Sequence, residues 1–276
     1  MIQRTIAIAS IVTSSFISLP ALAQNTQSEL LFDALGLPDI VDIMREEGVV
    51  YGAQIGTDLF PNQVSPAWRA TVETIYDSSA MHASVEAAFI HALDNQDVTP
   101  MVAFFSSDLT KTLVSHEVSA RRALLDDTVD QASKDVATVA KFNNTERFQL
   151  VDAFVQTNDL IEINVAGAMN SNVAFYMGLM AGGALDEALT QDQILNDVWD
   201  QAADIRANTS EWVYGFLLRA YDPVRGVDLE TYTAFSASDT GVALIGALFA
   251  AFDDMFDSKS FALGREAARV MAGQDL

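Results

Sequence analysis

A stretch of 30 residues occurs twice in this chain, and its recurrence limits how the chain can fold. Residues 97–126 align without a gap with residues 228–257, and eight of the 30 aligned positions are identical. The match is strongest where Phe104 aligns with Phe235, each followed closely by a serine and an aspartate. Self-similarity at a fixed offset, here 131 residues, is the sequence signature of a duplicated structural unit.

The same offset aligns two of the three tryptophans of the chain, Trp68 with Trp199. Aligned tryptophans outside the repeated stretch extend the similarity toward the start of each unit. We therefore predict two related helical modules that pack together, residues 24–141 and residues 142–276.

Helix-start signals divide both predicted modules into segments. Ser65 and Thr99 each precede a proline, a residue that is favoured in the first turn of a helix. Thr190 and Gln193 have the spacing of a capping box ahead of residues 194–218. Apolar residues at helical spacing follow each signal, so the sequence predicts an all-α fold.

Two apolar stripes follow the repeated stretch. The first steps by four and seven residues and predicts one long helix with a narrow apolar face: Val114, Val118, Leu125, Val129 and Val136. The second is broader and predicts a more deeply buried helix: Leu244, Ile245, Leu248, Phe249, Phe252 and Phe256. Elsewhere, Val49–Ile55 and Leu160–Val165 alternate in the manner of a strand, which leaves a short strand as the alternative there.

The repeated motif predicts a sharp turn between two helices. One helix ends near Phe104 or Phe235, and Ser107 or Ser238 caps the next helix. An aspartate follows each serine in the first turn, where the helix dipole favours an acid.

The motif resembles a family of exported bacterial helical proteins called domain of unknown function two-zero-five-nine. That family shows a phenylalanine, often followed by tyrosine, and then Ser-Pro-x-Gly before a second helix. The segment from Phe104 keeps the aromatic residues and the serine but has Asp108 and Thr110 in place of the proline and the glycine. The segment from Phe235 keeps the serine and the glycine, with Asp239 in the proline position. The resemblance implies export and helices, and it implies no activity.

The first 23 residues predict a cleavable secretory signal peptide. Arg4 precedes an apolar stretch from Ile6 to Leu19, and Ala21 and Ala23 form a small-x-small cleavage site. That stretch is shorter than the roughly 20 residues that span a bilayer, so a retained anchor is the less favoured alternative. We expect a periplasmic or secreted protein after cleavage near Ala23.

The chain has 38 acidic and 15 basic residues, a net charge of -23, and no cysteine. Such a surface repels phosphate backbones, so nucleic acid is not an expected partner. The charge serves solubility, with a cationic partner or divalent ions as the alternatives. Because disulfides are excluded, packing must stabilise the fold.

The sequence contains no recognisable catalytic or metal-binding motif, and it implies no cofactor. His82, His91 and His116 all lie in the first module, and His82 has Glu86 at the i, i+4 spacing of two metal ligands, but no third ligand lies nearby in the sequence. A structural role is therefore favoured for the histidines. Thiol nucleophiles, G-x-S-x-G elbows and P-loops are absent from the sequence.

Two clusters of carboxylates support alternative functions. They are Asp126, Asp127 and Asp130, and Asp253, Asp254 and Asp257. Paired acids serve glycoside cleavage or calcium binding, although on a helix they more often form a solvated face. Only Asp126 and Asp257 align between the copies.

Gly178 and Gly182 lie four residues apart in the apolar run from Val173 to Leu185. Small residues at this spacing let helices approach closely. The run is too short to span a bilayer, so we predict a buried helix and no integral membrane protein, with docking on a membrane or a hydrophobic partner as the alternative.

The aromatic residues Trp68, Trp199, Phe104 and Phe235 are the candidates for lining a binding groove, although paired aromatic residues more often belong to a core. The expected function is a non-catalytic periplasmic binding or envelope-associated component, with an envelope protein or a small apolar ligand as its partner. The alternatives are an acid-based hydrolase of an envelope polymer and a divalent-cation-binding protein.

Overall fold

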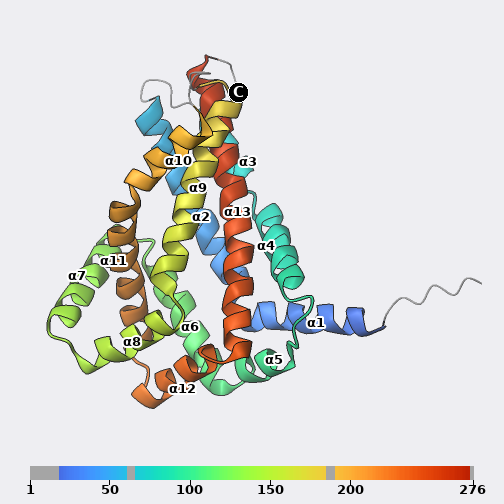
Figure 1. Ribbon diagram of the computed structural model, residues 1–276, viewed down its shortest axis with the longest axis vertical. Helices are drawn as coiled ribbons and strands as arrows, with labels where there is room; N and C mark the ends of the chain where they lie inside the picture. Colours follow the sequence, from blue (N-terminus) through green and yellow to red (C-terminus); the bar gives the residue numbers. More distant parts are fainter. Residues whose placement is uncertain (1–18, 61–65, 185–189, 274–276) are drawn as a thin grey trace, which may run out of the picture.

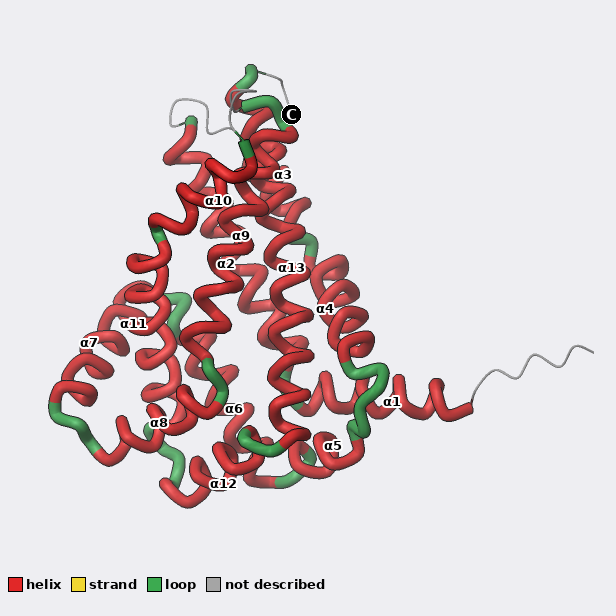
Figure 2. The backbone as a smooth tube through the Cα atoms, in the orientation of Figure 1, coloured by secondary structure: helices red, strands yellow, loops and turns green. Residues whose placement is uncertain are grey.

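The computed structural model describes residues 19–60, 66–184 and 190–273, which form helices joined by short turns and contain no strand (Figures 1 and 2). The predicted all-α fold is confirmed. The helices are α1 (Leu19–Ala34), α2 (Leu37–Leu59), α3 (Pro66–Ile75), α4 (Ser78–Ala92), α5 (Thr99–Phe105), α6 (Asp108–Ala123), α7 (Asp127–Phe142), α8 (Glu146–Thr157), α9 (Leu160–Ala181), α10 (Gln191–Asp200), α11 (Ala202–Tyr221), α12 (Gly226–Ser236) and α13 (Asp239–Met271).

The long helices α9 and α13 lie side by side at the centre of the molecule (Figure 1). Helix α4 packs on the opposite side of α13, and α11 packs against α9, α6 and α7. The molecule tapers toward the end where α13 finishes, and α5, α8 and α12 lie at the broad end (Figure 1).

Glycines let α9 and α13 approach closely. A Cβ atom on Gly178 of α9 would overlap the carbonyl oxygen of Phe261, and one on Gly264 of α13 would overlap the carbonyl oxygen of Phe175. A Cβ atom on Gly182 would likewise overlap the Cβ atom of Ala268. The predicted close packing of the apolar run through its glycines is confirmed.

Two hydrophobic clusters form the core. The first joins α1 to α5 with α13 around fully buried residues such as Phe89 and Leu263. The second joins α6, α7, α8 and α11 around Val151 and Tyr221. Each cluster combines residues from before and after residue 141, so the two predicted modules share their cores.

The two copies of the repeated motif form the same local structure. Helix α5 ends at Phe105 and α12 at Ser236, one residue from the predicted ends. The side chain of Ser107 accepts a hydrogen bond from the backbone of Thr110, and that of Ser238 accepts one from Gly241. The predicted caps are confirmed, and the duplication as a whole stays a prediction.

Two predicted helices are interrupted. The stripe from Val114 to Val136 does not form one helix, because Asp126 ends the turn after α6 and caps α7 with hydrogen bonds from Thr128 and Val129. Val136 is exposed. The capping box at Thr190 is confirmed, but the segment that follows breaks into α10 and α11 at Gln201.

The strand alternative is wrong for both segments. Val49–Ile55 belongs to α2, where Gly48, Gly52 and Gly56 recur every fourth residue and face α3 and Tyr76. Residues four apart lie on one face of a helix, and in α2 that face is buried. The apolar residues between the glycines give the sequence an alternating pattern that resembles a strand. Leu160–Val165 forms the first turns of α9.

Residues 1–18 of the predicted signal peptide and the predicted cap Ser65 lie outside the described residues. The side-chain amide of Gln24, just after the predicted cleavage site, donates to backbone carbonyls of Leu93 and Asp94 at the end of α4. Within the described ranges no single helix has the length and apolar character of a membrane span, although α12 and α13, bent by 82°, meet those criteria as a pair.

Candidate functional site

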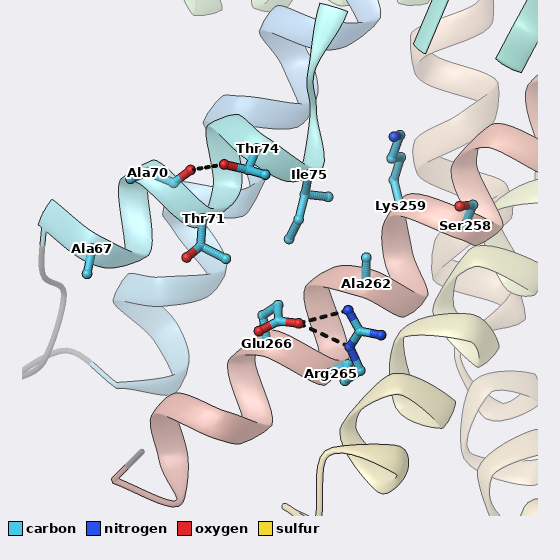
Figure 3. Close-up of a pocket in the computed structure, with 10 residues that line it drawn as sticks. All are labelled: Ala67, Ala70, Thr71, Thr74, Ile75, Ser258, Lys259, Ala262, Arg265 and Glu266. Atoms are coloured by element: carbon cyan, nitrogen blue, oxygen red, sulfur yellow. Dashed lines mark hydrogen bonds and ion pairs between the residues drawn. The ribbon is translucent and has the colours of Figure 1, made fainter. Parts of the chain in front are cut away.

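A groove of about 640 Å³ lies between α3 and α13 near the narrow end of the molecule (Figure 3). The α3 wall consists of short or branched side chains, those of Ala67, Ala70, Thr71, Thr74 and Ile75. Helix α3 presents this wall because Trp68 and Val72, on its other face, are buried in the core. The Thr74 hydroxyl donates to the carbonyl of Ala70, whereas the Thr71 hydroxyl has no hydrogen-bond partner among the described residues.

The α13 wall carries the charge. It consists of Ser258, Lys259, Ala262, Arg265 and Glu266. The Glu266 side chain is 11% exposed, and two arginines compensate its burial. Nη2 of Arg265 lies 2.9 Å from Oε1 of Glu266, and Nη1 of Arg269 lies 2.9 Å from Oε2. The two guanidinium groups leave this cluster with a positive charge.

Lys259 differs from the arginines because it has no acidic partner. Among the described residues no carboxylate lies within ion-pair distance of its ammonium group. Partial burial lowers the pKa of Lys259, and the charge of Asp77 acts in the opposite direction. A partly desolvated cation without a carboxylate partner is stabilised by an added anion.

The predicted tryptophans lie in unlike environments. Trp68 is fully buried, its indole nitrogen donates to the carbonyl of Gly52 over 3.0 Å, and its ring meets Phe60 edge-on. Trp199 is 71% exposed on α10. Neither lines the groove, although Trp68 positions the helix that does.

The predicted phenylalanines pack against each other at the broad end of the molecule. The rings of Phe104 and Phe235 stack with their centroids 3.8 Å apart, and Tyr232 extends the stack. Both phenylalanines are partly buried against the first hydrophobic cluster. They form a core contact there and do not line the groove.

The carboxylate clusters do not form one site. Asp126 caps α7, and Asp130 pairs with Lys134. Asp257 lies on α13 and accepts a hydrogen bond from Ser171 of α9 over 3.2 Å. Burial raises the pKa of Asp253 and of Asp257. The described residues contain no group of three or more histidine and carboxylate side chains placed to hold a metal ion.

The histidines have local partners or a position beside a cavity. Nε2 of His82 lies 2.9 Å from Asp42, and this contact lowers the pKa of Asp42. His91 contacts Asp94 three residues later. His116 borders a cavity of about 570 Å³ between α6, α7 and α11.

No family model, curated protein or solved structure matches this chain. The resemblance to domain of unknown function two-zero-five-nine therefore stays a prediction. The groove between α3 and α13 is therefore identified from its lining residues alone.

A half-buried carboxyl group, that of Glu117, lies between the two hydrophobic clusters and is not among the predicted site residues. The phenolic oxygen of Tyr221 lies 2.5 Å from the carboxylate of Glu117, and Tyr232 lies beside the same carboxylate. Burial raises the pKa of Glu117 to about 7, although both tyrosines act in the opposite direction. The sequence could have indicated this contact, because Glu117 lies at helical spacing from the buried residues Leu113, Val114 and Ala120 of α6.

The groove and the Glu117 contact differ in what they can do. The groove offers an ammonium group, hydroxyls and small apolar side chains to a ligand. The Glu117 carboxyl is surrounded by tyrosines within a packed junction between helices. The groove therefore suits binding, and the Glu117 contact suits a structural role.

Proposed function

We propose that this protein is an exported, non-catalytic binding component of the cell envelope, and that the groove between α3 and α13 is its binding site. The predicted signal peptide supports the location. The observation that carries the binding proposal is Lys259, a partly buried cation without a carboxylate partner in the wall of the groove. Other basic residues of the described ranges, such as Lys111 and Arg219, also have no ion pair, so Lys259 is distinguished by its place in the wall of the groove together with its partial burial.

The placement of the two aligned aspartates disfavours a hydrolytic pair made of Asp126 and Asp257, although Asp253 and Asp257 interact within their own cluster. An acid-based hydrolase needs two carboxyl groups on either side of the scissile bond, within about 10 Å of each other. Asp126 belongs to the start of α7, which packs on α11, whereas Asp257 lies in the interface of α13 with α9. The aligned aspartates thus serve different helix pairs.

Affinity capture from a periplasmic extract tests the proposal. The mature chain from Gln24 is immobilised, and the retained small molecules and proteins are identified by mass spectrometry. We expect at least one component that the variant Ala70→Glu no longer retains, because Ala70 lines the groove. The matched control Ala53→Glu adds the same charge to an exposed position of α2 and should retain it.

Two results would contradict the proposal. One is a reproducible hydrolytic activity of the mature chain that a single substitution abolishes. The other is equal retention by the wild type and by Ala70→Glu. The location is tested separately by the mass of the chain in a periplasmic fraction, which should lack residues 1–23.

A further inference from the structure

We infer that the groove between α3 and α13 binds a monocarboxylate that carries an aliphatic chain. This inference rests on the proposed binding function and names the ligand class of that same site. Its evidence is the charge, the hydrogen-bond donors and the shape of the two walls (Figure 3).

The charge of the groove is opposite to that of the chain. Lys259 and Arg265 contribute two positive charges to the lining of the groove and Glu266 one negative charge, and Arg269 pairs with Glu266 from outside the lining. The acid whose charge acts on Lys259 is Asp77, at the start of α4. The positive charges of the α13 wall therefore attract an anion locally, even though the net charge of the molecule repels it.

The number of unpaired cations indicates a single negative charge on the ligand. Glu266 already pairs with both arginines, so Lys259 is the cation of the α13 wall without a carboxylate. A multiply charged anion such as a phosphate ester would need more than one free cation to offset the repulsion of an acidic chain. A carboxylate needs one ammonium group and hydroxyl donors, and Thr71 and Ser258 are the hydroxyl residues beside Lys259 and Thr74 in the lining of the groove.

The remaining surface of the groove indicates an aliphatic body. Ala67, Ala70 and Ile75 on α3 lie opposite Ala262 on α13 (Figure 3). These side chains offer methyl groups and leave the space between the helices open. The volume of about 640 Å³ lies within the range of roughly 300–1,000 Å³ that small-molecule sites have. No aromatic side chain lines the groove to stack on a planar ligand.

Calorimetry on the mature chain with octanoate and octanamide tests the inference. The two probes share the aliphatic chain and differ in charge. We expect octanoate to bind and octanamide to bind at least about tenfold more weakly, because charge-assisted hydrogen bonds are roughly twice as strong as neutral ones. Acetate, which lacks the aliphatic body, should also bind more weakly than octanoate.

The variant Lys259→Met keeps the length of the side chain and removes the charge. We expect it to weaken octanoate binding about tenfold or more, and Lys259→Arg to restore most of the affinity. The matched control Lys111→Met removes an exposed lysine from α6 and should bind octanoate as the wild type does.

Three outcomes would overturn the inference: no heat with millimolar octanoate, equal binding of octanoate and octanamide, or equal binding by the wild type and Lys259→Met. The capture experiment separates this failure from failure of the proposed function. If Ala70→Glu fails to retain a component in the capture experiment and octanoate does not bind in calorimetry, only the proposed ligand class is contradicted. Equal retention by that variant contradicts the binding site itself.

Discussion

The rings of Phe104 and Phe235 stack in parallel, with centroids 3.8 Å apart and planes inclined by 4°. These two residues align in the repeated stretch of the sequence, so equivalent positions of the two copies contact each other directly. The contact joins α5 to α12 and ties the two helix–turn–helix motifs together at the broad end of the molecule.

A double-mutant cycle on this pair should show coupling. We expect Phe104→Leu and Phe235→Leu each to lower the free energy of unfolding, and the double variant to lose less than the sum of the two by about 0.5–1.5 kcal/mol. Urea denaturation measures the three differences. The control pair is Phe104→Leu with Phe142→Leu, because Phe142 is 89% exposed, and it should be additive. Additivity within the stacked pair as well would contradict the contact.

The helix caps could be predicted from the sequence because the residues that form each cap are close in sequence. Ser107 caps α6 through Thr110, three residues later, and the capping box joins Thr190 to Gln193. The break at Asp126 was missed for a related reason. The apolar stripe of α6 continues past the break, so periodicity alone could not show that Asp126 changes its backbone conformation to cap a new helix.

The groove could not be predicted, because its walls come from opposite ends of the chain. The wall with Thr71 and the wall with Lys259 face one groove only after α13 packs along α2, α3 and α4. The prediction of binding aromatic residues rested on their alignment between the copies, and aligned residues need not have the same solvent exposure. Trp68 is buried where Trp199 is exposed.

The glycine contact between α9 and α13 predicts opposite effects of two alanine substitutions. Gly178→Ala should lower the free energy of unfolding by about 1–3 kcal/mol, because its Cβ would overlap the backbone of α13. Gly246→Ala should raise it by about 0.5–1 kcal/mol, because no atom outside its own helix lies within 4 Å of that Cβ and alanine favours the helix. Thermal unfolding measures both.

The shift in Tm should follow the same order. Each kcal/mol corresponds to about 2–4 °C in a chain of this size. Equal effects of Gly178→Ala and Gly246→Ala would contradict the close approach of the two helices.

Fluorescence should distinguish the two aligned tryptophans. We expect Trp199→Phe to remove a red-shifted emission that acrylamide quenches readily, since Trp199 is exposed. Trp68→Phe should instead remove a blue-shifted, protected component. It should also destabilise the fold by about 1–3 kcal/mol, because the carbonyl of Gly52 loses its indole donor. Equal quenching in the two variants would contradict their different burial.

Glu117 should make stability depend on pH between its two pKa values. The pKa of Glu117 is about 7 in the folded protein, against 4.5 for an ordinary glutamate. The folded state therefore holds a proton that the unfolded state has released, so the contribution is complete below about pH 4.5 and is lost as the pH rises through about 7. The loss amounts to at most about 3 kcal/mol, at 1.36 kcal/mol for each pKa unit.

The variant Glu117→Gln isolates this contribution, because the amide oxygen still accepts from Tyr221 but does not ionise. Denaturation at several pH values should show wild-type stability falling relative to this variant between about pH 4.5 and pH 7. Asp253 and Asp257 also have raised pKa values and remain in both proteins, so their contribution cancels. The control Glu230→Gln, at an exposed position of α12, should run parallel to the wild type. If the curve of Glu117→Gln were parallel as well, the junction would hold an ionised carboxylate, and the two clusters would be joined by a charge.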